Sequence, residues 1–323
     1  MGGIAYSSLA LAVHSAGGFG FIGAALDLAV VEKELSIASE TLSKTDSGHL
    51  PIGVGFLLFA LKLEDVLPTV QKNKPAVVWL SMPKKLSDFA TWTSKIREVS
   101  SGTQIWIQVG SVTSALEVAK ACKPDALAVQ GSDAGGHGFE KGAGIISLLP
   151  EVHDALDAAG LSTPLLAAGG IVDGRGVAAA LALGAEGVVM GTRFLSCPET
   201  NIHARYRDAV LAANDGGQST IRSKLFDNLP GANVWPEYID GRGIVAESYT
   251  DHENGVEIEE IRRLHKEALS GADAGYGVDG KGRAAMWAGT GVGIVRRQQG
   301  AAEVVEEVRR EAKKAAERAR ANL

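Results

Sequence analysis

The sequence is poor in cysteine and has no long hydrophobic run. Its two cysteines, Cys122 and Cys197, lie far apart and show none of the CxxC spacing that marks zinc or redox sites, which is typical of a reducing compartment. No apolar stretch reaches the roughly 20 residues of a transmembrane helix, and Met1 to Ala5 lack the basic and then apolar layout of a signal peptide. These absences speak against a disulfide-rich secreted domain or a membrane protein and predict a cytoplasmic location.

Basic residues are also fewer than acidic ones. The net charge is −6, whereas nucleic acids and anionic membranes attract basic surfaces, so neither is expected as the main partner. The histidines other than His137 lack the paired spacing of metal ligands, and no metal site is expected. The sequence leaves the oligomeric state open, a homodimer included.

Aromatic residues make up only 6% of the chain, whereas glycine is abundant, with 40 residues among 323. Together with 46% hydrophobic residues, this composition suits a barrel with a full core and many turns. Seven short apolar runs predict strands at 19–22, 52–56, 76–80, 105–109, 127–130, 164–168 and 187–190. Helix-length amphipathic segments separate these runs, so the strands should form one parallel sheet.

The expected fold is therefore an α/β barrel of the (β/α)8 TIM type that lacks its first strand. The chain opens directly on a helix expected at 4–15, which suggests an N-terminal truncation or a misplaced start codon. Residues 1–198 should form the barrel core. Residues 199–300 should form a cap of helices and loops that completes the barrel mouth, because a long stretch rich in tryptophan and glycine often shapes a pocket. Residues 301–323, with Glu and Arg at i,i+4 spacing, should form a solvated terminal helix.

A glycine-rich loop with a single histidine is expected directly after one buried strand. The run Asp125–Gln130 is short and mostly apolar, and residues 131–139 carry four glycines around His137. Ligands bind at the carboxyl ends of strands in α/β proteins, glycines let the backbone approach a flat ligand, and an imidazole exchanges protons near neutral pH. His137 is therefore a candidate catalytic residue. The alternative is a surface turn that carries a solvated histidine.

Two later strands also end in small residues, at Pro164–Ile171 and Gly187–Phe194, with a short helix expected between them at 173–184. In an eight-stranded barrel, the phosphate of a cofactor lies on the loops after strands 7 and 8, held by backbone N–H groups. The pair of loops therefore predicts a phosphate site, although tight turns alone would explain either glycine cluster by itself.

Two other signals carry less weight. The pattern GxGxxG occurs at 18–23 and 275–280, but neither match stands between a strand and a helix, so a nicotinamide fingerprint is not indicated. Cys197 follows the last strand, and packing explains it better than a role as nucleophile.

Five segments, in order over nearly the whole chain, resemble the nitronate monooxygenases, formerly called 2-nitropropane dioxygenases. They are Met1-Gly2-Gly3, Ser15–Gly23, Val129–His137, Ala167–Ile171 and Met190–Phe194. The resemblance implies an FMN-dependent barrel enzyme without a metal, which oxidises alkyl nitronates with O2 to a carbonyl compound and nitrite. It also implies that His137 is the catalytic base.

The same resemblance implies a set of cofactor contacts. Gln130 and Gly135 correspond to contacts with the flavin and its ribityl chain. The positions that resemble the phosphate site are Gly169, Gly170, Val189, Met190, Gly191 and Thr192. Met1 and Gly2 remain of the first strand, whose backbone lies beside the flavin ring in the family. Gly55 departs from the pattern, because many relatives carry there an asparagine that touches the flavin.

The implied chemistry agrees with the residues. A neutral imidazole, with a pKa near ~6.5, can remove the acidic α proton of a nitroalkane when backbone N–H groups hold the forming nitronate. Two other interpretations stay open. One is an FMN-dependent NAD(P)H reductase similar to the enoyl and quinone reductases, and the other is an inactive barrel that has lost its first strand.

Overall fold

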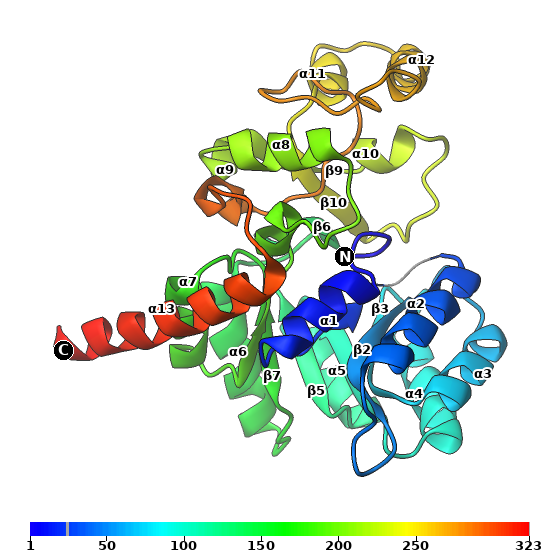
Figure 1. The fold of residues 1–323 in the computed structure, drawn as a ribbon, viewed down its shortest axis with the longest axis vertical. Coiled ribbons are helices and arrows are strands. Elements are labelled where there is room, and N and C mark those ends of the chain that lie inside the picture. The colour runs from blue at the N-terminus through cyan, green and yellow to red at the C-terminus, as the bar shows by residue number, and fades with distance from the viewer. Residues whose placement is uncertain (24–25, 323) are drawn as a thin grey trace.

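The computed structural model describes residues 1–23 and 26–322, and its centre is a curled parallel sheet (Figure 1). Seven strands form this sheet in the order β1-β2-β3-β4-β5-β7-β8. They are β1 Phe21–Ile22, β2 Leu50–Leu57, β3 Pro75–Ser81, β4 Gln104–Val109, β5 Ala126–Gln130, β7 Leu165–Ala168 and β8 Gly187–Val189. Each of the seven predicted strands is present and every pairing is parallel, so the predicted α/β barrel class is confirmed.

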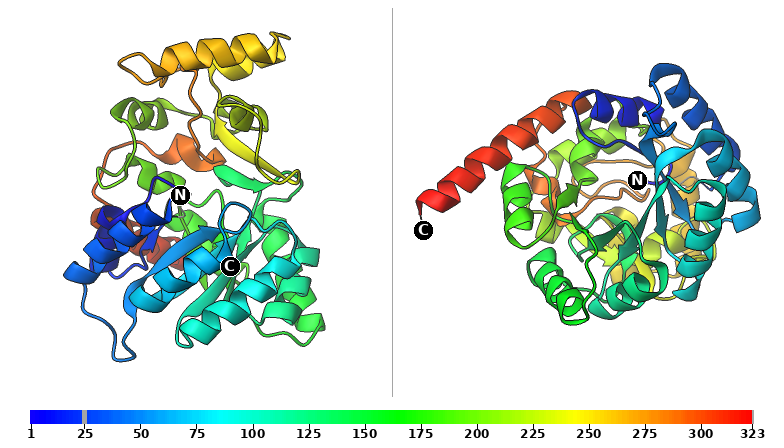
Figure 2. Two further views of the ribbon diagram at one scale, coloured as in Figure 1. Left: turned by 90° about the vertical axis from the view of Figure 1, so that its right-hand side faces the viewer. Right: turned by 90° about the horizontal axis from the view of Figure 1, so that it is seen from below.

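Helices surround the sheet on its outer side, as the view from below shows (Figure 2, right). They are α1 Ser7–Ser15, α2 Leu28–Thr41, α3 Leu63–Asn73, α4 Ser87–Val99, α5 Val112–Cys122, α6 Ile145–Ala158 and α7 Gly174–Ala182. The strands bury Val54, Ile105 and Leu127 completely against these helices. Burial of such side chains stabilises the fold by roughly 1.5–3 kcal/mol each, which explains why the strands read as apolar runs.

The N-terminal residues lie between the two edges of the sheet. A Cβ on Gly23, directly after β1, would lie 2.1 Å from the carbonyl oxygen of Met1, and one on Gly191, beyond β8, would lie 3.7 Å from Cγ of Met1. Within the described part of the chain, β1 and β8 each pair with one neighbour only. Met1 therefore bridges the carboxyl ends of the two edge strands without forming a ladder.

The C-terminal helix α13 (Ala301–Ala321) completes the ring of helices between α7 and α1. Ala301, Val304 and Val308 are buried in one apolar cluster with Leu9 of α1. The prediction of a solvated helix is therefore wrong for its first half. The many Glu and Arg residues concealed a buried stripe at i, i+3 and i+7, which is the pattern of a helix face packed on a core. The second half extends away from the body (Figures 1 and 2).

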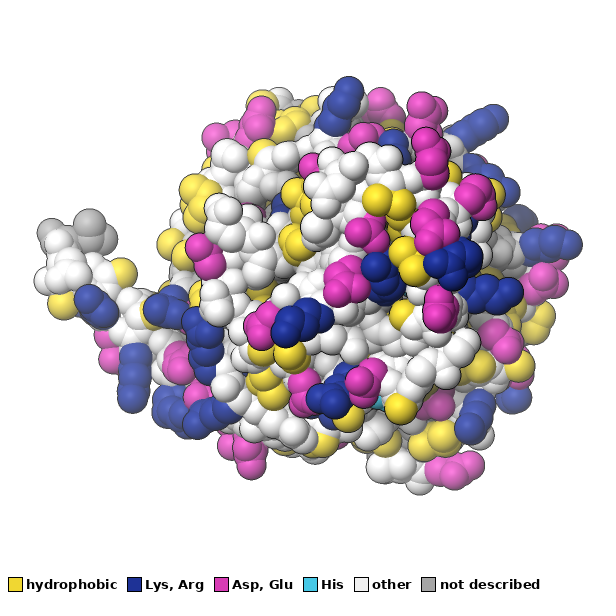
Figure 3. All heavy atoms as spheres, turned by 90° about the horizontal axis from the view of Figure 1, so that it is seen from above, with side chains coloured by type: hydrophobic (Ala, Val, Ile, Leu, Met, Phe, Trp, Pro, Cys, Tyr) yellow, Lys and Arg dark blue, Asp and Glu magenta, His cyan; other side chains and the backbone are white. Residues whose placement is uncertain are grey.

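A second layer covers the mouth of the barrel. It contains α8 Ala204–Ala212, α9 Gly216–Ser219, β9 Thr220–Ser223, α10 Leu225–Asn228, β10 Ile239–Ile244, α11 Glu247–Glu253 and α12 Ile258–Leu269. Strand β6 (Gly136–Phe139) joins this layer through an antiparallel sheet in the order β6-β10-β9. We call residues 199–300 the cap. Seen from above, its surface mixes acidic and basic side chains (Figure 3).

Two expectations about backbone conformation are wrong. His137 lies on strand β6 and not in a loop, and residues 199–300, expected to contain only helices and loops, also contain strands β9 and β10. The sequence Gly-His-Gly-Phe has low intrinsic strand propensity, and its partner β10 lies about a hundred residues later in the chain, where Gly241 is opposite His137. Tertiary pairing therefore overrides the local preference.

None of the helices in residues 1–23 and 26–322 has both the length and the apolar character needed to cross a membrane.

Candidate active site

Strand β6 holds His137 above the carboxyl end of β5. The side-chain amide of Gln130, the last residue of β5, donates from Nε2 to the backbone oxygen of His137 at 3.2 Å. Its Oε1 accepts a hydrogen bond from Nε2 of Gln108 at 2.8 Å, and Oε1 of Gln108 accepts from the indole of Trp79 at 3.2 Å. A chain of side-chain hydrogen bonds across three strands thus fixes the backbone at His137.

Asp227 of α10 is the polar partner of the histidine ring. Nε2 of His137 and Oδ1 of Asp227 are 2.6 Å apart, and the two side chains are 16% and 4% exposed. The second oxygen, Oδ2 of Asp227, is buried and has no hydrogen-bond partner among the described residues. The cap therefore supplies a buried carboxylate directly to a histidine that the barrel side positions.

Aromatic rings cover the imidazole. Trp235 stacks on it with ring centroids 3.5 Å apart and planes 10° from parallel, and Trp287 lies tilted at 4.6 Å. The ring of Phe59, which follows β2, lies tilted against Trp235 with centroids 4.7 Å apart. These rings exclude water from the faces of the imidazole and leave its edge as the route for a reacting group.

The segment Leu229–Tyr238, which carries Trp235, is anchored at both ends. The hydroxyl of Tyr238 donates to the backbone oxygen of Pro83 in the loop after β3. The Arg262 guanidinium of α12 donates to the backbone oxygens of Asn228 at 2.8 Å and Gly231 at 3.0 Å. Trp235 is therefore held over His137 by contacts from both the barrel and the cap.

Two arginines, Arg222 of β9 and Arg242 of β10, lie in the antiparallel sheet that contains β6. Arg222 donates from both Nε and Nη2 to the single oxygen Oδ1 of Asp240, and Arg242 donates to the backbone oxygen of Ser132 at 3.2 Å. Desolvation, with a further contribution from Arg222, lowers the pKa of Arg242, although a guanidinium remains charged in proteins. The carboxylates of Asp133 and Asp240 act on the Arg242 guanidinium in the opposite direction, so the positive charges beside β6 are partly offset.

The predicted phosphate positions gather at the carboxyl ends of β7 and β8. Gly169 and Gly170 have positive φ angles of 105° and 74°, a conformation that glycine adopts at low cost. The backbone N–H groups of Gly169, Gly170 and Gly191 donate to no other residue that the structure describes. Val189, Met190 and Thr192 adjoin Gly191, where the 3-10 helix η1 (Thr192–Ser196) begins. Unpaired N–H groups at two adjacent strand ends are what a mononucleotide phosphate requires, so these residues fit the cofactor.

Other predicted contacts have a packing role that the sequence did not reveal. A Cβ on Gly135 would lie 2.3 Å from the backbone nitrogen of Gly289, so this glycine is required where the barrel loop meets the cap. The hydroxyl of Thr192 accepts a hydrogen bond from the same nitrogen at 2.9 Å. Met1 covers Gly191, whereas the backbone nitrogen of Gly2 would lie 3.3 Å from a Cβ on Gly23, directly after β1.

Sequence reasoning missed Asp227 and the direct contact of Trp235 and Trp287 with His137. The two tryptophans stand in stretches already expected to shape the pocket, so their composition was a usable signal. Asp227 belongs to no motif, because its role depends on a tertiary contact across 90 residues.

The cysteines are unsuited to nucleophilic roles. Burial raises the pKa of the Cys122 thiol to about 11 and, together with the charge of Glu199, that of Cys197 to about 12. Cys197 is completely buried in the apolar cluster beneath α13. Both thiols therefore stay protonated near neutral pH and act as packing groups. Among the described residues, no group of three or more His, Cys, Asp or Glu side chains could hold a metal ion.

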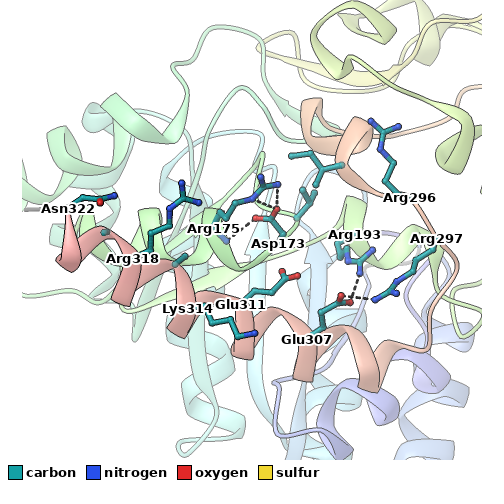
Figure 4. Close-up of a pocket in the computed structure, with 14 residues that line it drawn as sticks. Asp173, Arg175, Arg193, Arg296, Arg297, Glu307, Glu311, Lys314, Arg318 and Asn322 are labelled. Atoms are coloured by element: carbon teal, nitrogen blue, oxygen red, sulfur yellow. Dashed lines mark hydrogen bonds and ion pairs between the residues drawn. The ribbon is translucent and has the colours of Figure 1, made fainter.

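A cavity of about 710 Å³ lies outside the mouth, between α7, α13 and the 3-10 helix η2 (Thr290–Ile294) (Figure 4). Its charged lining residues are Asp173, Arg175, Arg193, Arg296, Arg297, Glu307, Glu311, Lys314 and Arg318. Glu307 pairs with Arg193 at 3.1 Å and with Arg297 at 2.7 Å. The cavity contains no histidine, and its carboxylates serve structural pairs, so the mouth with His137 is the candidate active site.

Comparisons with known proteins concern the family and the fold of the chain. The family described as "Nitronate monooxygenase" matches residues 69–311. The nitronate monooxygenase npaC of Metarhizium robertsii is 45% identical over 314 residues, which cover 94% of this chain and 87% of that protein. FabK of Thermotoga maritima superposes with a TM-score of 0.75 at 28% identity, covering 100% of this chain and 94% of that one. A nitroalkane oxidase of Streptomyces ansochromogenes superposes with a TM-score of 0.74, covering 97% and 93% of the two chains. Its identity is 22%, so this likeness concerns the fold alone.

Proposed function

Because the chain belongs to the nitronate monooxygenase family, we propose that it is an FMN-dependent oxidoreductase that converts alkyl nitronates and O2 to a carbonyl compound and nitrite. The observation that carries the proposal is the arrangement around His137. A histidine with a buried carboxylate partner and aromatic cover stands beside strand ends whose N–H groups are unpaired. This combination offers a base and a phosphate site within one mouth.

We assign the cofactor contacts as follows. Gly169, Gly170, Val189, Met190, Gly191 and Thr192 would hold the phosphate, Gln130 and Gly135 the ribityl chain and ring, and Met1 and Gly2 the remaining edge. The support for this assignment is the unpaired N–H groups after β7 and β8. A bound flavin would supply the electron chemistry between the nitronate and O2.

The chain's own residues would supply proton transfer and charge stabilisation. His137 would remove the α proton of a neutral nitroalkane, a role that typically contributes about 10²–10⁴-fold to the rate. Trp235 and Trp287 would exclude water from the imidazole, which strengthens electrostatic interactions within the site. Arg242 hydrogen-bonds to Ser132 and Thr220 rather than to a carboxylate of the described residues, and its positive charge would favour an anionic nitronate.

The substitution His137→Asn tests the proposal. We expect turnover of neutral nitroalkanes to fall by about 10²-fold or more, whereas preformed nitronates, which need no deprotonation, should keep much of their activity. Oxygen consumption with both substrate forms measures the difference. The control is His153→Asn on α6, because His153 is half-exposed and lies beside Gly184, which precedes β8 and so stands at the end of the barrel opposite the mouth.

Equal losses on both substrate forms would remove His137 from the role of base. Activity with NADH and an enoyl or quinone acceptor, without any oxidation of nitronates, would replace the oxidase by the reductase.

A further inference from the structure

We propose that Asp227 is a positioning residue that holds His137 as the tautomer protonated at Nε2, so that Nδ1 is the atom that removes the substrate proton. The proposal rests on the role of His137 as base and adds the identity of the reacting nitrogen and of the residue that selects it. Asp227 acts through the imidazole and does not itself touch the substrate.

The short contact defines the direction of the hydrogen bond. A carboxylate only accepts hydrogen bonds, so the 2.6 Å contact between Nε2 of His137 and Oδ1 of Asp227 has the imidazole as donor. Hydrogen bonds to a charged acceptor are shorter and stronger than neutral ones. Asp227 thereby stabilises the proton on Nε2.

The other nitrogen of the ring is left free. Nδ1 of His137 has no hydrogen-bond partner among the described residues, and this atom is not completely buried. A neutral imidazole carries one N–H, so a ring protonated at Nε2 presents a lone pair at Nδ1. Nδ1 is therefore both basic and accessible.

The surroundings keep the ring in this orientation. Trp235 stacks on one face and Trp287 lies against the ring at an angle, so tilting of the ring plane would lose both contacts. A half-turn of the ring that keeps its plane would place a carbon in place of Nε2 at Asp227 and lose the hydrogen bond. On the backbone side, Gln130 fixes the position of residue 137. The salt bridge between Lys224 and Glu140, with N and O 3.0 Å apart, ties the start of α10 to the end of β6.

Asp227 would lower the stability of the fold if its role were purely structural. Its Oδ2 is buried without a described partner, and such an atom typically costs about 1–3 kcal/mol. Filling the same position with an apolar side chain would remove this cost. A buried carboxylate against a histidine is explained when the carboxylate sets the tautomer of that histidine.

The experiment combines nitrogen-15 NMR of histidine-labelled protein with kinetics. In the unsubstituted protein, the chemical shifts of His137, assigned by comparison with His137→Asn, should show Nε2 protonated and Nδ1 unprotonated at neutral pH. In Asp227→Asn, which keeps the side-chain shape, the proton should move in part to Nδ1. The catalytic efficiency kcat/KM for a neutral nitroalkane should fall at least about tenfold, within the range of a general base, while activity on the preformed nitronate is largely kept. Asp208→Asn on α8, where the side chain is half-exposed, is the matched control.

Protonation of Nδ1 in the unsubstituted protein, or NMR signals that Asp227→Asn leaves unchanged, would overturn the proposal. Equal kinetic losses on nitroalkane and nitronate would also overturn it, because they would indicate a structural effect. If Asp227→Asn does not fold, the tautomer of the unsubstituted protein still decides. If the unsubstituted protein oxidises neither substrate, the proposed function fails, whereas the tautomer remains a separate test of the Asp227 contact.

Discussion

The barrel and the cap contribute to the site by different structural routes. In the barrel, the contributing residues stand at the carboxyl ends of strands of successive β-α units, as Gln130 ends β5 and Gly169 follows β7. In the cap, Asp227 and Trp235 reach His137 through contacts between distant segments, among them the pairing of β10 with β6, about a hundred residues apart. The barrel thus offers positions for a cofactor, whereas the cap completes the surroundings of the base.

The substitution Gly135→Ala, at the junction of barrel and cap, should disrupt the packing between the two regions most strongly. The added Cβ would lie 2.3 Å from the backbone nitrogen of Gly289 and 2.4 Å from the backbone carbon of Ala288, and neither atom can move independently of the cap. We expect the free energy of unfolding to fall by about 1–3 kcal/mol, as for overpacking in a core, and Trp287 to withdraw from His137. Chemical denaturation measures the loss.

Gly142→Ala is the matched control for this change, since its Cβ would meet only ordinary van der Waals contacts. Equal stabilities of the two variants would contradict the close junction of barrel and cap.

The cover over the base is tested by Trp235→Ala. Loss of the stacked indole should expose the imidazole to water and lower kcat/KM for nitroalkanes, with a stability loss of about 0.5–1.5 kcal/mol from the aromatic contact. Trp235→Phe keeps an aromatic face toward His137 and Phe59 and should recover most of the activity. Steady-state kinetics and denaturation of both variants measure this, and identical behaviour of Ala and Phe would show that stacking has no role.

A smaller difference between the regions is the effect of acid on the free energy of unfolding, because the cap contains a buried histidine. Burial lowers the pKa of His265 in α12 of the cap. The unfolded chain therefore binds this proton at a higher pH than the folded one, so the free energy of unfolding should fall as the pH drops below about 6.5, by at most about 1.4 kcal/mol per pH unit.

The variant His265→Gln should lose part of this acid sensitivity, whereas replacement of the half-exposed His153 of α6 should leave it unchanged. Denaturation curves between pH 7.5 and 5.5 provide the measurement. An unchanged pH slope in His265→Gln would refute the assignment.

Sequence reasoning predicted the strands of the barrel better than the elements that depend on contacts between distant segments. Strands such as β4 and β5 are apolar runs bounded by amphipathic helices, and hydrophobic periodicity reveals these patterns within short windows. Strand β6 has two glycines in four residues and forms because β10 pairs with it. The buried face of α13, formed by Ala301, Val304 and Val308, was hidden among charged neighbours.

The candidate site shows the same limit. His137 and the glycines after β7 and β8 were recognised because these residues directly follow predicted strands, where ligands bind in α/β proteins. Asp227 was not, because an isolated aspartate carries no local signal and its function requires a histidine 90 positions away. Contacts between distant segments are therefore the part of the site that needs a structure.

The most direct test of the central claim is anaerobic reduction of bound flavin. The purified chain is reconstituted with FMN, free flavin is removed, and visible absorbance is followed after addition of an alkyl nitronate and, separately, of NADH. We predict that flavin is retained and that the nitronate alone bleaches it. Bleaching by NADH but not by the nitronate, or a protein that retains no flavin, would contradict the account.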